Sequence, residues 1–218
     1  MRLSATIVCL PAVLLAGCSF FGKSEPLDAR YYSAERAFGP SASAAPVAAS
    51  AVPLRLGEVS GSTHLRERIA YRTAPRELGF YDGRRWTERP EAYLRRALAH
   101  ALFEQRGMQR ITSGVAPTLE VELTHFEEVL APRHAVRVQA HVLLRDHRSA
   151  RFEHTFGAEQ EVESGTFDAV PEALANALGR VVDEISDRVV AELQARPALV
   201  SPDPAARQPA DVPALQSH

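Results

Sequence analysis

Cysteine is almost absent from this 218-residue chain, and its only two cysteines, Cys9 and Cys18, lie in the first eighteen residues. The 200 residues after Cys18 therefore offer no disulfide, no thiolate metal site and no cysteine nucleophile. Lysine is scarcer still, because Lys23 is the only lysine among 25 basic residues. Its position before the body of the chain excludes both a Walker A lysine and Schiff-base chemistry there.

The chain also lacks an excess of charge of one sign. It has 25 basic and 27 acidic residues, a formal net charge of -2, and no overall basic character that would indicate a nucleic-acid partner. Hydrophobic residues make up 45% and charged residues 24%, which is the range of an ordinary globular protein. The length makes one domain the default.

The motifs of several enzyme classes are missing as well. The sequence has no Gly-x-Gly-x-x-Gly run for phosphate and no Gly-x-Ser-x-Gly nucleophile elbow. The paired carboxylates Glu127-Glu128 and Asp183-Glu184 fall on elements that we expect to be exposed, and we interpret both pairs as solvated. We predict a protein without catalytic residues and without a cofactor.

Eight histidines raise the question of a metal site. His125, His141 and His154 lie on predicted strands. Strict alternation places His125 on the apolar face with Leu123 and places His141 on the opposite face. The sequence has no His-x-His pair and no His-Glu-x-x-His helix, so we predict no metal site.

The N-terminus reads as a targeting segment. A positive charge at Arg2 precedes an apolar run over residues 5–16, and small residues follow, as in a secretory signal peptide. The run contains Pro11 and is short of the ~20 residues of a membrane-spanning helix, although an uncleaved anchor is the alternative reading.

The segment Leu15-Ala16-Gly17-Cys18 resembles a bacterial lipobox. The resemblance implies cleavage before Cys18, a diacylglyceryl group on its thiol and acylation of its new amino group by fatty acids such as palmitate. Two or three acyl chains hold a protein durably at a membrane. Ser19 stands where aspartate would favour inner-membrane retention, which implies an outer-membrane lipoprotein that faces the periplasm.

Composition divides the chain into four parts. We predict a signal peptide over 1–17, an acylated cysteine with a tether and an Ala/Pro/Ser-rich linker over 18–53, a folded domain over 54–195, and a disordered Pro-rich tail over 196–218. Tyr31-Tyr32-Ser33 is either a brief edge strand or part of the tether.

Hydrophobic periodicity predicts the elements of the domain. Extended segments are expected at 54–59, 68–72 and 77–81, and Asp82-Gly83 predicts a hairpin turn after the third. A helix starts near Pro90 and stops at Gly107. Three alternating strands, at 119–124, 136–144 and 152–163, precede a helix at 168–194. Together they predict an α+β two-layer sandwich, with a mainly antiparallel or mixed sheet and both helices on one face.

An aromatic cluster precedes the first predicted helix. Phe80, Tyr81 and Trp86 either staple this helix to the sheet or contact a partner or a lipid. The nearby arginines either bind acidic headgroups or form a solvated helix face that Glu88 and Glu91 partly offset. These arginines are Arg84, Arg85, Arg89, Arg95 and Arg96.

The order of these segments is similar to that of a known family. A lipobox, Tyr31-Tyr32-Ser33, the extended pieces from Ile69 to Trp86, a helix, and Leu119 to Leu123 with Phe126 resemble the ABC-type transport auxiliary lipoproteins, which include the lipoprotein of the Pqi system. The resemblance implies an outer-membrane adaptor that docks an MCE-domain protein working with an ABC permease and ATPase to move phospholipids.

Two other functions stay open at this point. One is a structural or assembly lipoprotein of the cell envelope, and the other is a tethered lipid-binding carrier. A carrier needs a dry internal pocket, whereas the alternating strands predict a filled core. A homo-oligomer is also compatible with the sequence.

Overall fold

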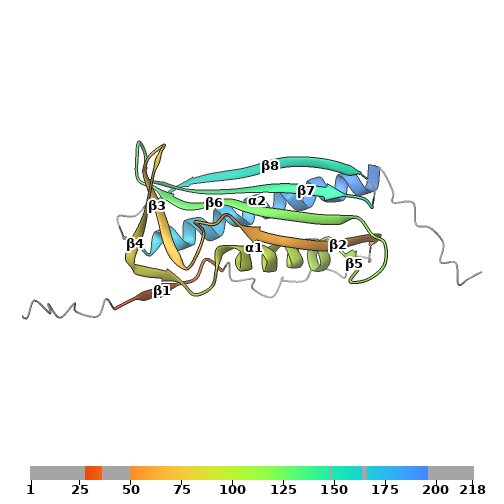
Figure 1. Ribbon diagram of the computed structural model, residues 1–218, viewed down its shortest axis with the longest axis horizontal. Coiled ribbons are helices and arrows are strands. Elements are labelled where there is room, and N and C mark those ends of the chain that lie inside the picture. The colour runs from red at the N-terminus through yellow and green to blue at the C-terminus, as the bar shows by residue number, and fades with distance from the viewer. Residues whose placement is uncertain (1–27, 36–49, 148, 164–165, 196–218) are drawn as a thin grey trace, which may run out of the picture.

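The computed structural model describes residues 28–35, 50–147, 149–163 and 166–195. In these residues eight strands form one mixed sheet, and the helices pack on one of its faces (Figure 1). The lipobox, the signal peptide and the Pro-rich tail lie outside the described residues. The elements are β1 (Arg30–Tyr32), β2 (Ser50–Gly61), β3 (Arg68–Ala74), β4 (Glu77–Trp86), α1 (Pro90–Ala99), η1 (His100–Gln105), β5 (Met108–Arg110), β6 (Thr118–Val129), β7 (Ala135–Arg145), β8 (Ala150–Glu161) and α2 (Ala169–Ala195).

Strand β6 is the branch point of the sheet. On one side it pairs antiparallel with β7, which pairs with β8. On the other side its first half pairs parallel with β2, and its last three residues pair parallel with β3. The sheet therefore divides into two arms, β2–β5 and β3–β4–β1, as Figure 1 shows.

The two-layer α+β prediction is confirmed, and the core lies between the sheet and α2. Hydrophobic side chains recur along α2 every three or four residues, and all of them are buried against the inner sides of β6, β7 and β8. Full burial of one such side chain contributes about 1.5–3 kcal/mol. They are Val170, Leu174, Leu178, Val181, Ile185, Val189 and Leu193. No helix in the described residues is both long and apolar enough to span a bilayer.

The first helix begins at Pro90, as expected for proline at an N1 position. It continues as the π-helical segment η1, and Gly107 ends it with a φ of 65°, where glycine avoids the steric cost of a side chain. Strand β5 follows directly and was not expected, because three residues carry too little periodicity to be recognised.

The predicted turn at Asp82-Gly83 is wrong. The chain reverses at Pro75-Arg76 instead, and β4 continues through Asp82 and Gly83 as far as Trp86. Its second half stays extended because it pairs with β1, and a register shift against β3 accommodates its extra residues. The same pairing places Tyr31 and Tyr32 in a strand, the first of the two readings of that segment.

A bulge in β6 overturns the expected position of His125. The register against β7 shifts between Leu123 and His125, so the inner face passes from Leu123 to Phe126. His125 is consequently on the outer, helix-free face, which it shares with His141. No group of three or more metal-ligating side chains gathers in the part of the chain that the structure describes.

Candidate functional site

The adjacent carboxylates Glu127 and Glu128 are buried, with exposures of 0% and 3%, so the expectation that they form a solvated face is wrong. They lie at the end of β6, where β3 pairs with this strand and covers them. Because neighbours on a strand point to opposite sides, Glu127 is on the outer face and Glu128 on the helix side. Asp183 and Glu184 on α2 are exposed, as expected.

Glu127 is held by an arginine fork. Arg72 of β3 donates from Nε to Oε1 at 2.7 Å and from Nη2 to Oε2 at 3.0 Å, and Arg137 of β7 lies 3.9 Å from the same carboxylate. The hydrogen bond to Glu127 raises the pKa of the Arg72 guanidinium above its ordinary value. A buried pair with this bidentate geometry fixes the position of β3 against β6.

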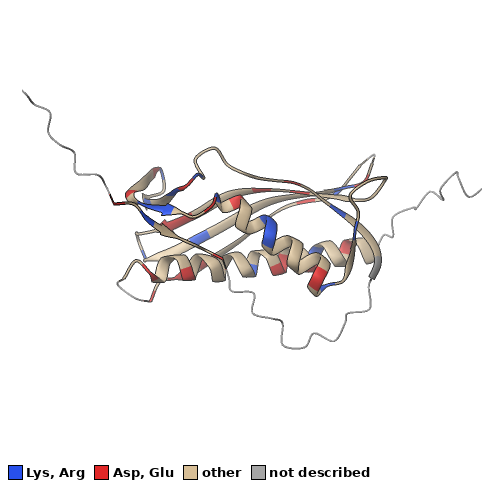
Figure 2. Cartoon of the chain, turned by 90° about the horizontal axis from the view of Figure 1, so that it is seen from below, with Lys and Arg blue, Asp and Glu red and all other residues tan. Residues whose placement is uncertain are grey.

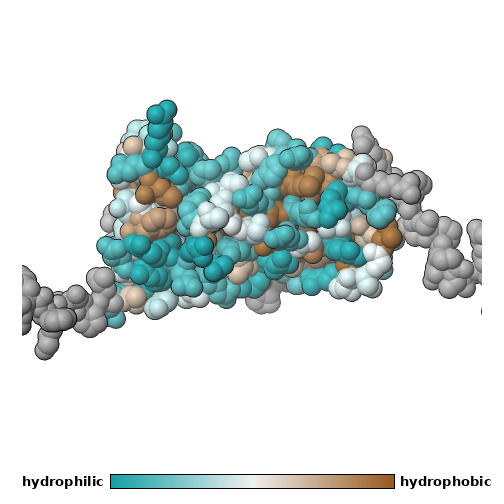
Figure 3. Space-filling view, in the orientation of Figure 1, coloured by the Kyte–Doolittle hydropathy of each residue, from teal (hydrophilic) through white to brown (hydrophobic). Residues whose placement is uncertain are grey.

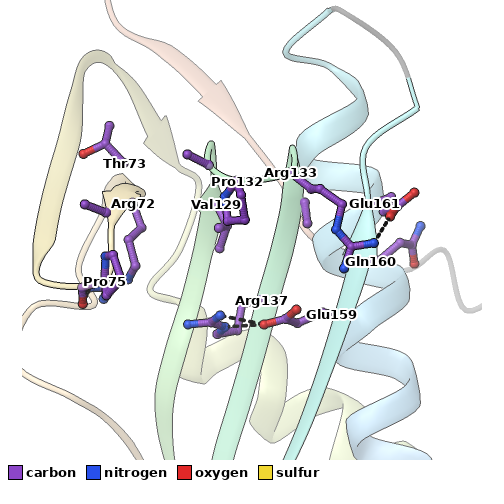
Figure 4. Close-up of a pocket in the computed structure, with 13 residues that line it drawn as sticks. Arg72, Thr73, Pro75, Val129, Pro132, Arg133, Arg137, Glu159, Gln160 and Glu161 are labelled. Carbon is purple, nitrogen blue, oxygen red and sulfur yellow. Dashed lines mark hydrogen bonds and ion pairs between the residues drawn. The ribbon is translucent and has the colours of Figure 1, made fainter.

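A groove of about 630 Å³ lies on the outer face beside this pair. Figure 4 shows its walls, which come from the end of β3, the β6–β7 turn, the start of β7 and the end of β8. Proline, alanine and valine side chains alternate around it with arginines and glutamates. The lining residues are Arg72, Thr73, Ala74, Pro75, Val129, Ala131, Pro132, Arg133, Ala135, Arg137, Glu159, Gln160 and Glu161.

Two exposed ion pairs cross the groove. Arg137 lies 2.6 Å from Glu159, and Arg133 lies 2.8 Å from Glu161 (Figure 4). Exposed pairs of this kind contribute only about 0–1 kcal/mol, so an acidic group on a ligand can replace a glutamate at small cost. The groove therefore suits a ligand that combines an anionic group with a narrow apolar surface. Sequence reasoning missed it, because its walls come from three separated segments and residues 131–134 indicated only a turn.

Glu128 lies on the opposite side of the sheet in a second polar network. The Tyr81 hydroxyl donates to its Oε2 at 2.6 Å, and Nε2 of His134 lies 2.6 Å from its Oε1. Burial, and next the hydrogen bond to Glu128, raise the pKa of Tyr81 well above its ordinary value. The polar end of Tyr81 is thus already occupied within the domain.

The structure separates the three aromatic residues that the sequence grouped together. Trp86 is in the core at 1% exposure, and its ring packs edge-on against Tyr93 of α1 and Phe126 of β6, at 6.2 and 5.3 Å between centroids. It staples α1 to the sheet and offers no surface to a partner.

Tyr81 and Phe80 lie on opposite faces of β4. The Tyr81 ring packs against Phe167, just before α2, at 5.1 Å between centroids. Phe80 pairs with Ala70 of β3, and its ring lies 5.4 Å from the Arg68 guanidinium. At this end of the sheet Figure 3 shows hydrophobic side chains among hydrophilic ones. The three aromatics do not form one contact surface.

The nearby arginines fall into two groups. Arg96 bridges Glu35 and Glu88, and Arg89 lies near Glu91, as expected for a solvated helix face. In contrast, the Arg84 guanidinium lies 3.6 Å from the Phe167 ring centroid and 4.4 Å from that of Tyr81. Arg85 donates to the carbonyl of Tyr81, and Arg95 to that of Gly57.

Comparison with known proteins identifies the family. A family model described as the ABC-type transport auxiliary lipoprotein component matches residues 37–186, which is more than half of the chain. No curated protein matches the chain.

Solved structures share the fold. The crystal structure of XCC0632 from Xanthomonas campestris is 21% identical, with a TM-score of 0.64, and the match covers 76% of this chain and 98% of that one. CT253 from Chlamydia trachomatis, a hypothetical protein, is 12% identical with a TM-score of 0.50, and the match covers 67% of this chain and 99% of that one. The resemblance seen in the sequence is confirmed, and the chain belongs to the family of ABC-type transport auxiliary lipoprotein components.

Proposed function

We propose that this protein is a non-catalytic lipoprotein of the outer membrane, facing the periplasm, and that it serves an MCE/ABC-type machine that moves phospholipids between membranes. The observation that carries the proposal is the family match over residues 37–186, in a chain whose residues 15–18 resemble a lipobox ending at Cys18. The family itself makes the protein an auxiliary component of ABC-type transport. The lipid cargo, the MCE partner and the outer membrane are our additions.

The packing of the domain favours an adaptor over a tethered carrier. Large side chains such as Leu119, Phe126 and Leu174 fill the space between the sheet and the helices at 0% exposure. The groove lies on the opposite face, and ion pairs cross it. A lipid acyl chain needs a dry apolar cavity, whereas this groove suits a polypeptide segment with an acidic side chain. We assign the groove to docking of the MCE-domain partner.

Two experiments test the proposal. Cys18→Ala should abolish acylation and release the chain from the membrane fraction, and a mutant that still fractionates with membranes would contradict the lipoprotein assignment. Affinity capture of the acylated, detergent-solubilised chain should recover an MCE-domain protein, and Arg133→Glu with Arg137→Glu should weaken this capture. Recovery of barrel-assembly or cell-wall proteins alone would favour the alternative of an assembly lipoprotein.

A further inference from the structure

Strands β1 and β4 bring arginines together at the edge of the sheet. In the parallel ladder Arg30 is in register with Arg84, and Tyr31 with Arg85. On the other side of β4, Arg85 is in register with Arg68. We call Arg30, Tyr31, Arg84 and Arg85 the basic edge, and Figure 2 shows basic residues in blue at this end of the domain.

In the part of the chain that the structure describes, the arginines of the basic edge make no ion pair with a carboxylate. Within the described residues neither Arg30, Arg84 nor Arg85 is within ion-pair distance of an acidic side chain, whereas Arg68 pairs with Asp82 at 2.7 Å. Like charges on adjacent strands destabilise a sheet, and an external anion relieves their repulsion. Asp28 and Asp168 are the exposed carboxylates that stand against these three arginines, since Asp82 already pairs with Arg68.

Arg84 is held in place for such an anion. Its guanidinium stacks on Phe167 and Tyr81, and it lines a shallow depression of about 330 Å³ together with Asp28, Arg30 and Gly83. A stacked guanidinium keeps its in-plane N–H donors for a phosphate, and an orientation fixed in advance lowers the entropic cost of binding.

Tyr31 supplies the second property of a membrane contact. Its side chain is 67% exposed on the outer face of the edge strand. A tyrosine that presents an apolar ring and a polar hydroxyl to solvent suits the boundary between headgroups and acyl chains. The edge thus combines phosphate donors with an interfacial aromatic residue.

The length of the chain before β1 places the basic edge close to the anchor. Arg30 follows Cys18 by twelve positions, so the chain between them spans at most about 40 Å when fully extended. The 27 residues of α2, which run the length of the domain, extend over a similar ~40 Å. A chain acylated at Cys18 therefore keeps its basic edge within about one domain length of the bilayer.

From these observations we propose that the basic edge binds the headgroups of anionic phospholipids in the membrane that carries the anchor. The proposal rests on the acylation of Cys18 for its geometry, but the charge and stacking at the edge do not depend on it. The docked surface holds the domain against the bilayer with β1 and β4 nearest the headgroups. Val115, in the loop before β6 and 83% exposed, is then held away from them.

The first experiment uses the acylated chain reconstituted in vesicles. Cys18 is the only cysteine of the cleaved chain, so Ser33→Cys provides a unique label site beside the edge and Val115→Cys provides a distant control. We expect spin-labelled headgroups to quench a fluorophore at position 33 several-fold more than one at position 115, and phosphatidylglycerol to increase the difference. Equal quenching at both positions would overturn the proposal while leaving the acylation itself intact.

The second experiment removes the anchor. The mature chain with Cys18→Ala, made without residues 1–17, should sediment weakly with vesicles that contain phosphatidylglycerol and not with phosphatidylcholine alone. Because one arginine near an anionic surface contributes about a fivefold change in binding, Arg84→Glu with Arg85→Glu should abolish it. Arg84→Glu alone has a matched control in Arg110→Glu, which makes the same change of charge, since Arg110 is also stacked on an aromatic ring, at 4.3 Å on Phe103, outside the edge. The proposal would be overturned if the chain did not sediment with phosphatidylglycerol vesicles, or if the edge variant and the control lost binding equally. Neither result depends on acylation, because this chain lacks Cys18.

Discussion

Two arginine-rich regions lie at the same end of the sheet and differ in how their charges are matched. Around the groove Arg72, Arg133 and Arg137 each face a glutamate, and one of these glutamates is fully buried. On the basic edge Arg30 is in register with Arg84, which stacks on aromatic rings, and Arg85 is in register with Arg68. The charges of the groove arginines are therefore balanced within the domain, whereas the charges of the basic edge are left for an external anion.

The largest effect is expected from breaking the matched region. Arg72→Leu leaves Glu127 charged and buried without its fork, which should lower the free energy of unfolding by about 3–5 kcal/mol. Urea denaturation measures this change. The double variant Arg72→Leu with Glu127→Leu removes both charges and should recover most of the loss. A double variant no more stable than the single one would show that Glu127 is not held by Arg72.

The second prediction concerns the other buried carboxylate. Tyr81→Phe removes the hydroxyl that donates to Glu128 but keeps the ring against Phe167, so the free energy of unfolding should fall by about 1.5–3 kcal/mol. Phe80→Leu on the opposite face of β4 is the control and should change stability less. If both substitutions cost the same, the hydrogen bond contributes little.

The third prediction compares the two regions directly. Arg133→Ala removes an exposed ion pair and should cost no more than about 1 kcal/mol of unfolding free energy. Arg30→Ala removes one member of a like-charged cluster and should leave stability unchanged or slightly raised at low salt, because repulsion is relieved. Thermal denaturation at low and high salt measures both, and a clear loss for Arg30→Ala would mean that the edge is matched after all.

The smallest effect is a pH dependence. Burial lowers the pKa of His125 below its ordinary value of 6.5, and the nearby Arg137 and Arg72 act in the same direction while Glu127 opposes them. A histidine with a lowered pKa in the folded state stabilises the fold above pH 6.5, and this contribution is lost as the pH falls through 6.5 to the folded-state pKa. His125→Gln should therefore lose less stability than the wild type between pH 7 and pH 5. Urea denaturation of both proteins at pH 7 and pH 5 measures this difference, and an equal loss of unfolding free energy in the wild type and the variant would contradict the prediction.

The sequence predicted the parts of the fold that carry long, regular patterns. The apolar stripe of α2 and the strands β7 and β8 each appear in the structure close to their expected bounds, whereas β6 continues five residues past its expected end at 124. Short sequence signals for turns were misleading where strand pairing with a distant segment determines the backbone conformation. Asp82-Gly83 has the composition of a turn, but β4 continues through it to residues 84–86, which pair with β1.

The candidate site was harder to predict because its partners are remote in sequence. Glu127 and Arg72 are 55 residues apart, and Glu128 and Tyr81 are 47 apart, so nothing near the carboxylates indicates their burial. The bulge in β6 also reverses which residues face the helices after Leu123, and a pattern of strict alternation does not predict this reversal. As a result His125 lies on the outer face. Phe167, which packs against Tyr81 and Arg84, sits in a connecting segment without any pattern.

The short ladder between β1 and β4 has a mechanical consequence. In a chain anchored at Cys18, any pull between the membrane and the rest of a transport machine enters the domain through β1, which is held by three register positions. Strands with so few backbone hydrogen bonds open at the lowest free energy, so β1 is the first element to peel away under load. Release of β1 lengthens the tether between Cys18 and the domain, while the long ladders of β6, β7 and β8 stay paired. The distance between the domain and the membrane can therefore change without unfolding of the core.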